Sequence, residues 1–356
     1  MNLFPHDIKL NGQLFPVAEL LRQKRAESDW EREWIDFLSE WYNGKDFIAV
    51  NTSGSTGAPK AIRLKKEFVA ASARRTISYF GLNENDPVLH CLPARYIAGK
   101  LMVVRALIGK LDMHLLDPSA DFAILRHPEL FTRSAMPFKF AAMVINQVDK
   151  LWNLPDWNLE FLLLGGSAIP SGLEEKLQRV KTRCFSSYAM TETATHVALR
   201  KLNGEGADGF YHCLDEIRVS LSDEACLQIL MPGLDQAFLQ TTDLAELKDD
   251  KTFRILGRAD HVIISGGIKF SPEELEKKLE PFISEPFVIS SLPHETLGRQ
   301  LILVVEGAES KDSIARLQAI CSHQLDKYER PRDIRMLNEL PRTPNGKINR
   351  KAVFAD

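Results

Sequence analysis

The sequence predicts an α/β protein with a large N-terminal α/β domain of layered sheets and a smaller α+β domain at the C-terminus. Three observations support this fold class. The 356 residues exceed what one core usually holds. Apolar runs of strand length alternate with helical patterns from Phe47 to Ser187. From about Glu216 the strands become shorter and are separated by turns, which indicates a small β-rich subdomain.

Within the N-terminal domain, the first helix begins at a capping box from Ser28 to Glu31, and its aromatic stripe is typical of core packing. Strands are expected on both sides of a Gly-rich loop at residues 52–60. A buried parallel strand at 161–164 ends at Gly165 and Gly166, as strands do at the ligand-facing edge of a sheet. Further helices are expected at 65–79, 100–108 and 172–180, and further strands at 88–92 and 111–116.

We expect the domain boundary at residues 257–260. Residues 1–259 then form the N-terminal domain, in which 210–259 are the β-rich subdomain, and residues 260–356 form the C-terminal domain. In the C-terminal domain the patterns predict strands at 262–264 and 301–305, helices at 272–279 and 313–325, and a basic tail.

Composition favours an ordinary globular protein, with 44% hydrophobic and 26% charged residues. The formal net charge of −3 gives no attraction to nucleic acid or to an anionic membrane, so neither partner is expected. No apolar run approaches the ~18 residues that span a bilayer. The five cysteines are scattered, which fits free thiols in a reducing compartment; together with the absence of a signal-peptide pattern, this predicts a cytoplasmic protein.

The Gly-rich loop has the composition of a polyphosphate cradle. Glycines let backbone N–H groups approach an anion, hydroxyls add donors and lysine adds a positive charge. Its spacing differs from that of a Walker A loop, and a plain Ser/Gly surface loop remains the alternative. The residues expected to contact phosphates are Thr52, Ser53, Gly54, Ser55, Thr56, Gly57 and Lys60.

Three later segments fit a nucleotide site. The segment after one strand contains Tyr188, whose ring can stack on a base, Thr191, whose hydroxyl can bind a phosphate, and Glu192, whose carboxylate can hold Mg²⁺. The alternative is that this segment only caps a helix. Asp243 can accept from ribose hydroxyls with Arg258 beside it; a turn Asp and a surface Arg are the alternative. A turn that contains Pro and Asn-Gly presents Lys347. The alternative is that this segment is a generic basic tail.

In this order and at this separation, these segments resemble the acyl-adenylate-forming superfamily of acyl-CoA synthetases, peptide-synthetase adenylation domains and firefly luciferase. The resemblance runs from about Val50 to the C-terminus. It includes Thr-Thr-Asp243, the hinge motif Gly-Arg-Ala-Asp260, the turn from Ser265 to Phe270 and the segment from Pro341 to Arg350.

The resemblance implies a role for each matching residue. The loop at 52–60 would hold the β- and γ-phosphates of ATP, Gly165, Gly166 and Ser167 would line the adenine and acyl site, and Tyr188 beside Ser187 would pack on adenine. Thr191 would contact the α-phosphate, and Glu192 with Thr56 would ligate Mg²⁺. Asp243 and Arg258 would hold the ribose, and Lys347 would be the catalytic lysine.

The resemblance also implies two half-reactions. A carboxylic acid and ATP give an acyl-AMP; the C-terminal domain then rotates about Asp260 as a mobile lid, and the turn ending at Lys269 lines the face where coenzyme A attacks. Residues 92–102, 188–200 and 340–348 further resemble o-succinylbenzoate–CoA ligases of menaquinone biosynthesis.

A succinylbenzoate substrate is a dianion, so its second carboxylate needs a polar or cationic partner. Lys100 and His196 are candidates, with donors from Tyr96 and Thr195 and with Ala189 lining the pocket. A solvated helix position for Lys100 and a core position for His196 remain open.

The sequence departs from the family pattern in four places, one of which is Tyr96, where relatives often have His or another aromatic residue. Ala189 and Thr242 replace glycines, and only 51 residues precede Thr52, so we expect a reduced N-terminal subdomain. Two other functions stay open: a different acyl- or aryl-CoA ligase or stand-alone adenylating enzyme, and a nucleotide-binding paralogue without ligase activity.

Overall fold

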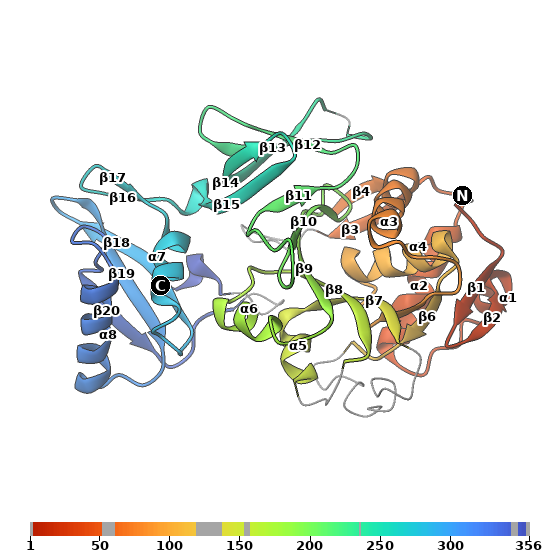
Figure 1. The fold of residues 1–356 in the computed structure, drawn as a ribbon, viewed down its shortest axis with the longest axis horizontal. Coiled ribbons are helices and arrows are strands. Elements are labelled where there is room, and N and C mark those ends of the chain that lie inside the picture. Colours follow the sequence, from red (N-terminus) through yellow and green to blue (C-terminus); the bar gives the residue numbers. More distant parts are fainter. Residues whose placement is uncertain are drawn as a thin grey trace. The chain divides into compact units, whose positions relative to one another are not determined.

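The computed structural model describes residues 3–51, 61–118, 137–152, 157–234, 236–342 and 348–353. The chain divides into two compact units, residues 1–169 with 176–217, and residues 170–175 with 218–356. Each unit is described by itself (Figure 1).

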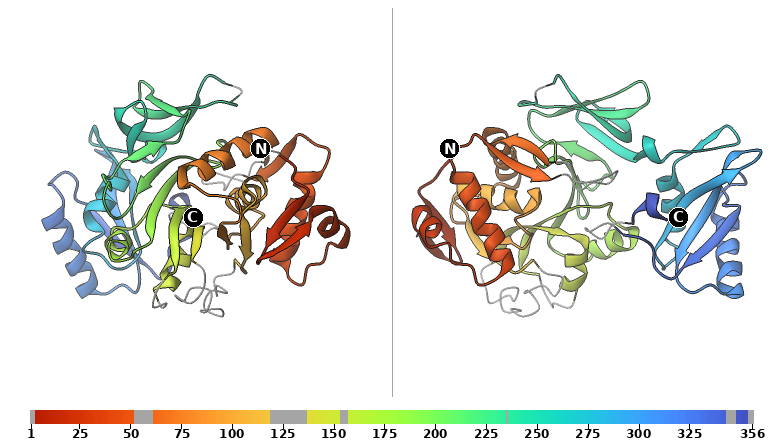
Figure 2. Two further views of the ribbon diagram at one scale, coloured as in Figure 1. Left: turned by 45° about the vertical axis from the view of Figure 1, so that its right-hand side comes forward. Right: turned by 180° about the vertical axis from the view of Figure 1, so that it is seen from behind.

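The first unit is built on a mixed sheet with the strand order β11-β10-β9-β8-β7-β5-β6-β1-β2. The strands from β9 to β1 are parallel to their neighbours, whereas β2, β10 and β11 are antiparallel. β1 and β2 lie at one edge of this sheet in every view (Figures 1 and 2). The strands are β1 (Asp7–Leu10), β2 (Gln13–Pro16), β5 (Pro87–His90), β6 (Asp112–Leu115), β7 (Phe138–Val144), β8 (Leu159–Gly165), β9 (Arg183–Ala189), β10 (His196–Lys201) and β11 (Tyr211–Cys213).

Helices pack on this sheet through a buried aromatic cluster. Phe80 at the end of α3 contacts Phe140, Phe161 and Phe185, which come from the neighbouring strands β7, β8 and β9. A separate hairpin pairs β3 (Phe47–Asn51) with β4 (Ala61–Lys65). The helices are α1 (Val17–Gln23), α2 (Asp29–Tyr42), α3 (Lys66–Phe80), α4 (Ile97–Gly109) and α5 (Ile145–Leu151); α6 (Ser171–Leu177) spans residues of both units.

Among the described residues, the second unit contains the antiparallel strands β12-β13-β14-β15, the hairpin β16-β17 and the sheet β18-β19-β20, in which β19 and β20 are parallel. α7 and α8 pack on one face of the last sheet; Leu340, Ile348 and Val353 cover the other. The elements are β12 (Arg218–Leu221), β13 (Cys226–Leu230), β14 (Leu239–Asp249), β15 (Thr252–Arg258), β16 (Ile263–Ser265), β17 (Ile268–Phe270), β18 (Phe287–His294), β19 (Gly298–Glu306), β20 (Asp333–Leu337), α7 (Pro272–Leu279) and α8 (Lys311–Gln324), with short 3-10 helices at Ala259–His261 and Arg350–Ala352.

The predicted fold class is confirmed, and the capping box of Ser28 and Glu31 is present at the start of α2. Sequence reasoning missed the N-terminal hairpin β1-β2 and the strands β7 and β10. The contact division falls near residue 217 and groups the β-rich strands with the C-terminal part. This division does not test the motion of residues 260–356 as a lid about Asp260, which stays a prediction.

Candidate functional site

The carboxyl edges of β8 and β9 bring the predicted adenine-site residues together. Ser187 Oγ donates a hydrogen bond to the carbonyl oxygen of Leu164, at 3.0 Å. A Cβ on Gly165 would lie 2.9 Å from that Oγ and would displace the Ser187 hydroxyl, and Gly166 has φ +93°, a conformation that favours glycine. Gly166 and Ser167 are exposed beside this edge. The ring of Tyr188 packs edge-on against Tyr211, with centroids 5.9 Å apart.

The residues after Tyr188 form a turn held by Thr193, which sequence reasoning missed. Thr193 Oγ1 accepts from the backbone N–H of Met190 at 3.2 Å and lies 2.6 Å from the carbonyl oxygen of Thr195. Thr191 and Glu192 are half-buried on this turn, while Ala189 is exposed before it. The structure has no helix at 190–195, so the helix-capping alternative is wrong. The sequence signal for Thr193 was that a threonine directly follows the predicted site residues Thr191 and Glu192.

His196 is a core histidine. It is buried, with Nε2 3.1 Å from Thr76 Oγ1 and Nδ1 3.0 Å from Thr195 Oγ1. Burial, with the Arg105 charge nearby, holds its pKa well below the usual value, so the ring is neutral. His196 and the Thr195 hydroxyl thus bond to each other inside the core, and their contact with the acid stays a prediction.

Lys100 has an internal partner. Its ammonium donates to Glu40 Oε2 at 2.7 Å and to the carbonyl oxygen of Ala49 at 2.9 Å, and only 7% of the residue is exposed. The Ala49 N–H donates to the other oxygen of Glu40, at 2.7 Å. The solvated alternative is thus wrong, and the charge proposed for the acid is already paired. Instead, Lys100 and Glu40 fix β3, the strand that leads into residues 52–60.

Another acid-pocket candidate, Tyr96, lies at the surface. Tyr96 is the N-cap residue of α4 and is 43% exposed, with the guanidinium of Arg95 5.1 Å from its ring centre. Its placement in an acid pocket stays a prediction.

The structure reveals a buried cation that sequence reasoning overlooked. Arg105 on α4 is 2% exposed, and its Nη1 donates to Sδ of Met102 at 3.2 Å. Its Nε has no hydrogen-bond partner, and no ion pair of Arg105 occurs among the described residues. Burial lowers the pKa of Arg105 to about 9. The signal in the sequence was that α4 carries only two charges, Lys100 and Arg105, in a helix that is otherwise apolar on every side.

In the second unit, the predicted ribose pair is formed by two neighbouring strands. Asp243 on β14 is the register partner of Arg258 on β15, and Nη1 of Arg258 lies 3.5 Å from Oδ1 of Asp243. Arg258 also donates from Nε and Nη2 to both oxygens of Asp260, at 2.8 and 3.0 Å. These bonds hold the pKa of Asp260 below its usual value.

The turn between β16 and β17 has the predicted form. Gly266 and Gly267 both have positive φ, as a two-residue hairpin loop requires, and Lys269 is exposed on β17.

Two predicted groups, residues 52–60 and Lys347, lie outside the described residues. The neighbours of the first segment behave as predicted, because Asn51 pairs with Ala61 where β3 ends and β4 begins. Arg342 and Ile348 form a β-bridge on either side of residues 343–347.

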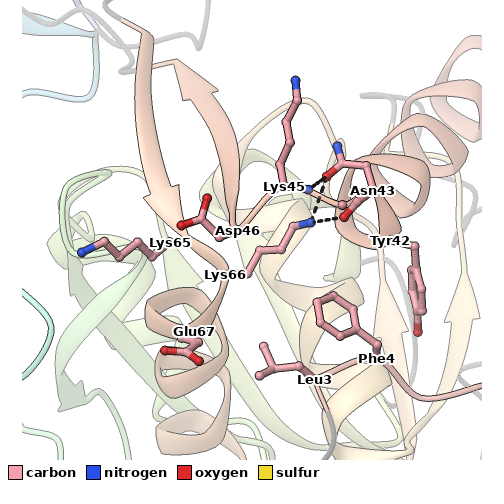
Figure 3. A pocket seen from close by; sticks show the side chains of 10 residues that line it. Leu3, Phe4, Tyr42, Asn43, Lys45, Asp46, Lys65, Lys66 and Glu67 are labelled. Atoms are coloured by element: carbon pink, nitrogen blue, oxygen red, sulfur yellow. Dashed lines mark hydrogen bonds between the residues drawn. The ribbon is translucent and has the colours of Figure 1, made fainter.

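A cavity of about 620 Å³ lies at the other end of the β3-β4 hairpin (Figure 3). Figure 3 shows the Lys66 ammonium turned toward Asn43, to whose carbonyl and side-chain oxygens it donates at 3.0 Å. None of the predicted site residues that the structure describes lines this cavity. The lining residues are Leu3, Phe4, Tyr42, Asn43, Gly44, Lys45, Asp46, Lys65, Lys66 and Glu67.

The described residues contain no group of three or more His, Cys, Asp or Glu that could hold a metal ion by itself. No described helix has the length and apolar character needed to cross a membrane. The five cysteines are free thiols.

Comparison with known proteins gave consistent matches. Residues 19–228 match the family of AMP-binding enzymes. The 2-succinylbenzoate–CoA ligases of Listeria monocytogenes and Oceanobacillus iheyensis are 25% and 27% identical to this chain. The matches cover 92% and 96% of it, and 73% and 77% of the relatives.

Two solved structures are also similar. An AMP-forming acyl-CoA synthetase-like protein from Dyadobacter fermentans is 31% identical, with 94% of this chain and 97% of that chain covered and a TM-score of 0.61. An o-succinylbenzoate coenzyme A synthetase from Bacillus subtilis, in complex with ATP and magnesium ion, is 20% identical. It has a TM-score of 0.71, with 95% and 82% covered, and shares the fold.

Proposed function

We propose that this chain, which belongs to the family of AMP-binding enzymes, is an AMP-forming acid–CoA ligase whose acid is 2-succinylbenzoate and whose product enters menaquinone biosynthesis. The names of the relatives suggest the acid. The five free thiols favour the cytoplasm as the place of the reaction.

The observation that carries the substrate proposal is the buried guanidinium of Arg105. A buried charge without a counter-ion costs several kcal/mol, so a guanidinium buried without an ion pair is a candidate partner for an anionic ligand. Arg105 has no ion pair among the described residues. A dianionic acid brings one carboxylate for reaction and a second that Arg105 can bind. A monocarboxylic acid would leave the guanidinium unpaired.

In the first half-reaction, a carboxylate oxygen of the acid attacks the α-phosphorus of ATP while the bond to pyrophosphate breaks. Two anions must approach, and at about 4 Å and an effective dielectric near 20 each charge pair repels by about 4 kcal/mol. Residues 52–60 hold the β- and γ-phosphates against this repulsion, and Lys347 contacts both the carboxylate and the α-phosphate. Their contribution is positioning and fixed positive charge.

The described residues fit a Mg²⁺ ion bound together with ATP. Mg²⁺ usually takes one or two carboxylates and completes its shell with water and substrate phosphates. Glu192, half-buried on the turn after β9, would supply such a carboxylate. Thr56, which lies outside the described residues, would be the second protein ligand. When bound, the ion offsets phosphate charge.

In the second half-reaction, the sulfur of coenzyme A attacks the acyl carbonyl carbon and the bond to AMP breaks, which gives the thioester. We propose that residues 260–356 rotate about Asp260 between the two steps and that Lys269 then lies beside the thiol. The thiol itself is the nucleophile, so no protein Ser or Cys is required.

A product assay tests this function. The protein is incubated with ATP, Mg²⁺, 2-succinylbenzoate and either coenzyme A or a carrier-protein thiol. We expect AMP, pyrophosphate and the CoA thioester in equal amounts. Thioester formation on the carrier alone would identify a stand-alone adenylating enzyme. ATP binding without AMP formation for any acid tried would identify a nucleotide-binding paralogue.

A further inference from the structure

Tyr211 on β11 contacts the tyrosine that is predicted to bind adenine. Its ring packs edge-on against the ring of Tyr188, with centroids 5.9 Å apart and planes inclined by 61°. The Tyr211 hydroxyl lies 3.1 Å from Oγ of Ser186. The guanidinium carbon of Arg200 lies 5.9 Å from the centre of the same ring. Tyr211 is therefore held by contacts to the two neighbouring strands β9 and β10.

The strand register explains why these side chains meet. Ala198 on β10 is the register partner of Tyr188 on β9 and of Cys213 on β11. Register partners lie on the same face of a sheet, and so do residues two positions apart along one strand. Tyr188 and Ser186 therefore share a face with Tyr211, which reaches them across β10. All of these residues belong to the first unit.

The contacts differ in burial in a way that suits a support for a ligand-binding ring. Ser186 is only 2% exposed, so the bond to its hydroxyl fixes the far end of Tyr211 inside the protein. The rings of Tyr188 and Tyr211 are both half-buried. An edge-on contact with Tyr211 occupies at most one face of the Tyr188 ring. It thus restricts the ring and leaves the other face to a flat partner.

We propose that Tyr211 is a positioning residue for the adenine base of ATP, acting through Tyr188. This role rests on the proposed function, in which ATP is the nucleotide and Tyr188 packs on adenine. A side chain that its neighbours already hold loses less rotamer freedom when a ligand binds. Tyr211 therefore raises the affinity for ATP by fixing the ring on which the base packs.

A double-mutant cycle tests this coupling. ATP binding with Mg²⁺ is measured by titration calorimetry without an acid, so that no turnover occurs. We expect Tyr211→Ala to weaken binding about 3- to 10-fold and Tyr188→Ala about 10-fold or more. Because Tyr211 acts through Tyr188, the double variant should bind ATP within about twofold of Tyr188→Ala alone.

Conservative variants separate the ring of Tyr211 from its hydroxyl. Tyr211→Phe and Ser186→Ala each remove one end of the same bond and keep the edge-on contact. Both should weaken ATP binding about two- to threefold and leave the KM for the acid within about twofold of wild type. Tyr211→Leu keeps apolar volume without a ring and takes the place of Tyr211→Ala if that variant fails to fold.

The chain offers a control with similar ring geometry. Tyr79 on α3 packs edge-on against Phe185 of β9, with centroids 5.8 Å apart. Phe185 is adjacent to Ser186 in the strand, so this contact lies on the opposite face of β9. Tyr79 is 46% exposed, so it matches the ring contact of Tyr211 and not its burial. Tyr79→Ala should leave ATP binding within about twofold of wild type.

The outcomes separate the positioning role from the proposed function. Losses of Tyr188→Ala and Tyr211→Ala that multiply in the double variant would overturn the positioning role, as would wild-type ATP affinity in either single variant. An equal loss in Tyr79→Ala would overturn it too. A wild-type protein that binds ATP and shows the coupling but forms no AMP with any acid would instead overturn the proposed function.

Discussion

Asp243 and Arg258 are direct partners in the register of β14 and β15, with 3.5 Å between Oδ1 and Nη1. The same guanidinium binds both oxygens of Asp260. One arginine therefore connects the proposed ribose carboxylate to the proposed hinge residue.

The first prediction concerns the ribose contact. Asp243→Asn should raise the KM for ATP about tenfold, because a charge-assisted hydrogen bond contributes about 1.5 kcal/mol or more. Steady-state kinetics with ATP and with 2′- and 3′-deoxy-ATP measure this. The wild type should discriminate against the deoxy nucleotides, and the variant should lose that discrimination. Equal discrimination by both proteins would show that Asp243 does not contact the ribose.

The second prediction concerns the buried cation. Arg105→Met should raise the KM for 2-succinylbenzoate on the order of 10- to 100-fold, because the second carboxylate loses its partner. The free energy of unfolding should stay the same or rise, since an apolar side chain replaces an unpaired buried charge. Acid-dependent kinetics and denaturant unfolding check both parts. An unchanged KM for 2-succinylbenzoate would show that Arg105 does not contact the acid.

The third prediction separates two roles for Lys100. Lys100→Met leaves Glu40 without its cation and should lower the free energy of unfolding by about 3 kcal/mol. Glu40→Gln, which keeps an acceptor for Ala49, is the matched comparison. If Lys100→Met unfolds like wild type but binds 2-succinylbenzoate poorly, Lys100 contacts the acid as the sequence predicts.

The fourth prediction concerns pH. Burial lowers the pKa of His90 to about 4 and that of His196 well below its usual value. Both rings are neutral when folded and take up protons on unfolding as pH falls below about 6.5. The free energy of unfolding is therefore not reduced by these two rings above that pH, and it falls as the pH decreases below it. Protonation of His90 alone should lower the free energy of unfolding by about 3 kcal/mol at pH 4.

Denaturant unfolding between pH 8 and pH 4 measures this loss. His90→Leu should flatten the dependence, whereas substitution of the exposed His323 by Gln should not. An unchanged slope in His90→Leu would contradict the prediction.

Sequence reasoning succeeded where the signal was local. The Gly165-Gly166 edge follows from the length of an apolar strand and from turn chemistry, and both are present. It failed where contacts join distant residues. Nothing in the sequence near Lys100 indicates that Glu40 is its partner. In the same way, nothing near His196 indicates that its two ring nitrogens lie within hydrogen-bond distance of Thr76 and Thr195. Whether a charge such as Arg105 is buried depends on how α4 packs on the sheet.

The most direct measurement is ATP–pyrophosphate exchange by the wild-type protein with 2-succinylbenzoate, benzoate and a medium-chain fatty acid, each with Lys347→Ala as the control. The account predicts much faster exchange with 2-succinylbenzoate than with the other acids, and its loss in Lys347→Ala while ATP binding survives. Equal exchange with all three acids would contradict the substrate, and undiminished exchange in Lys347→Ala would contradict the mechanism.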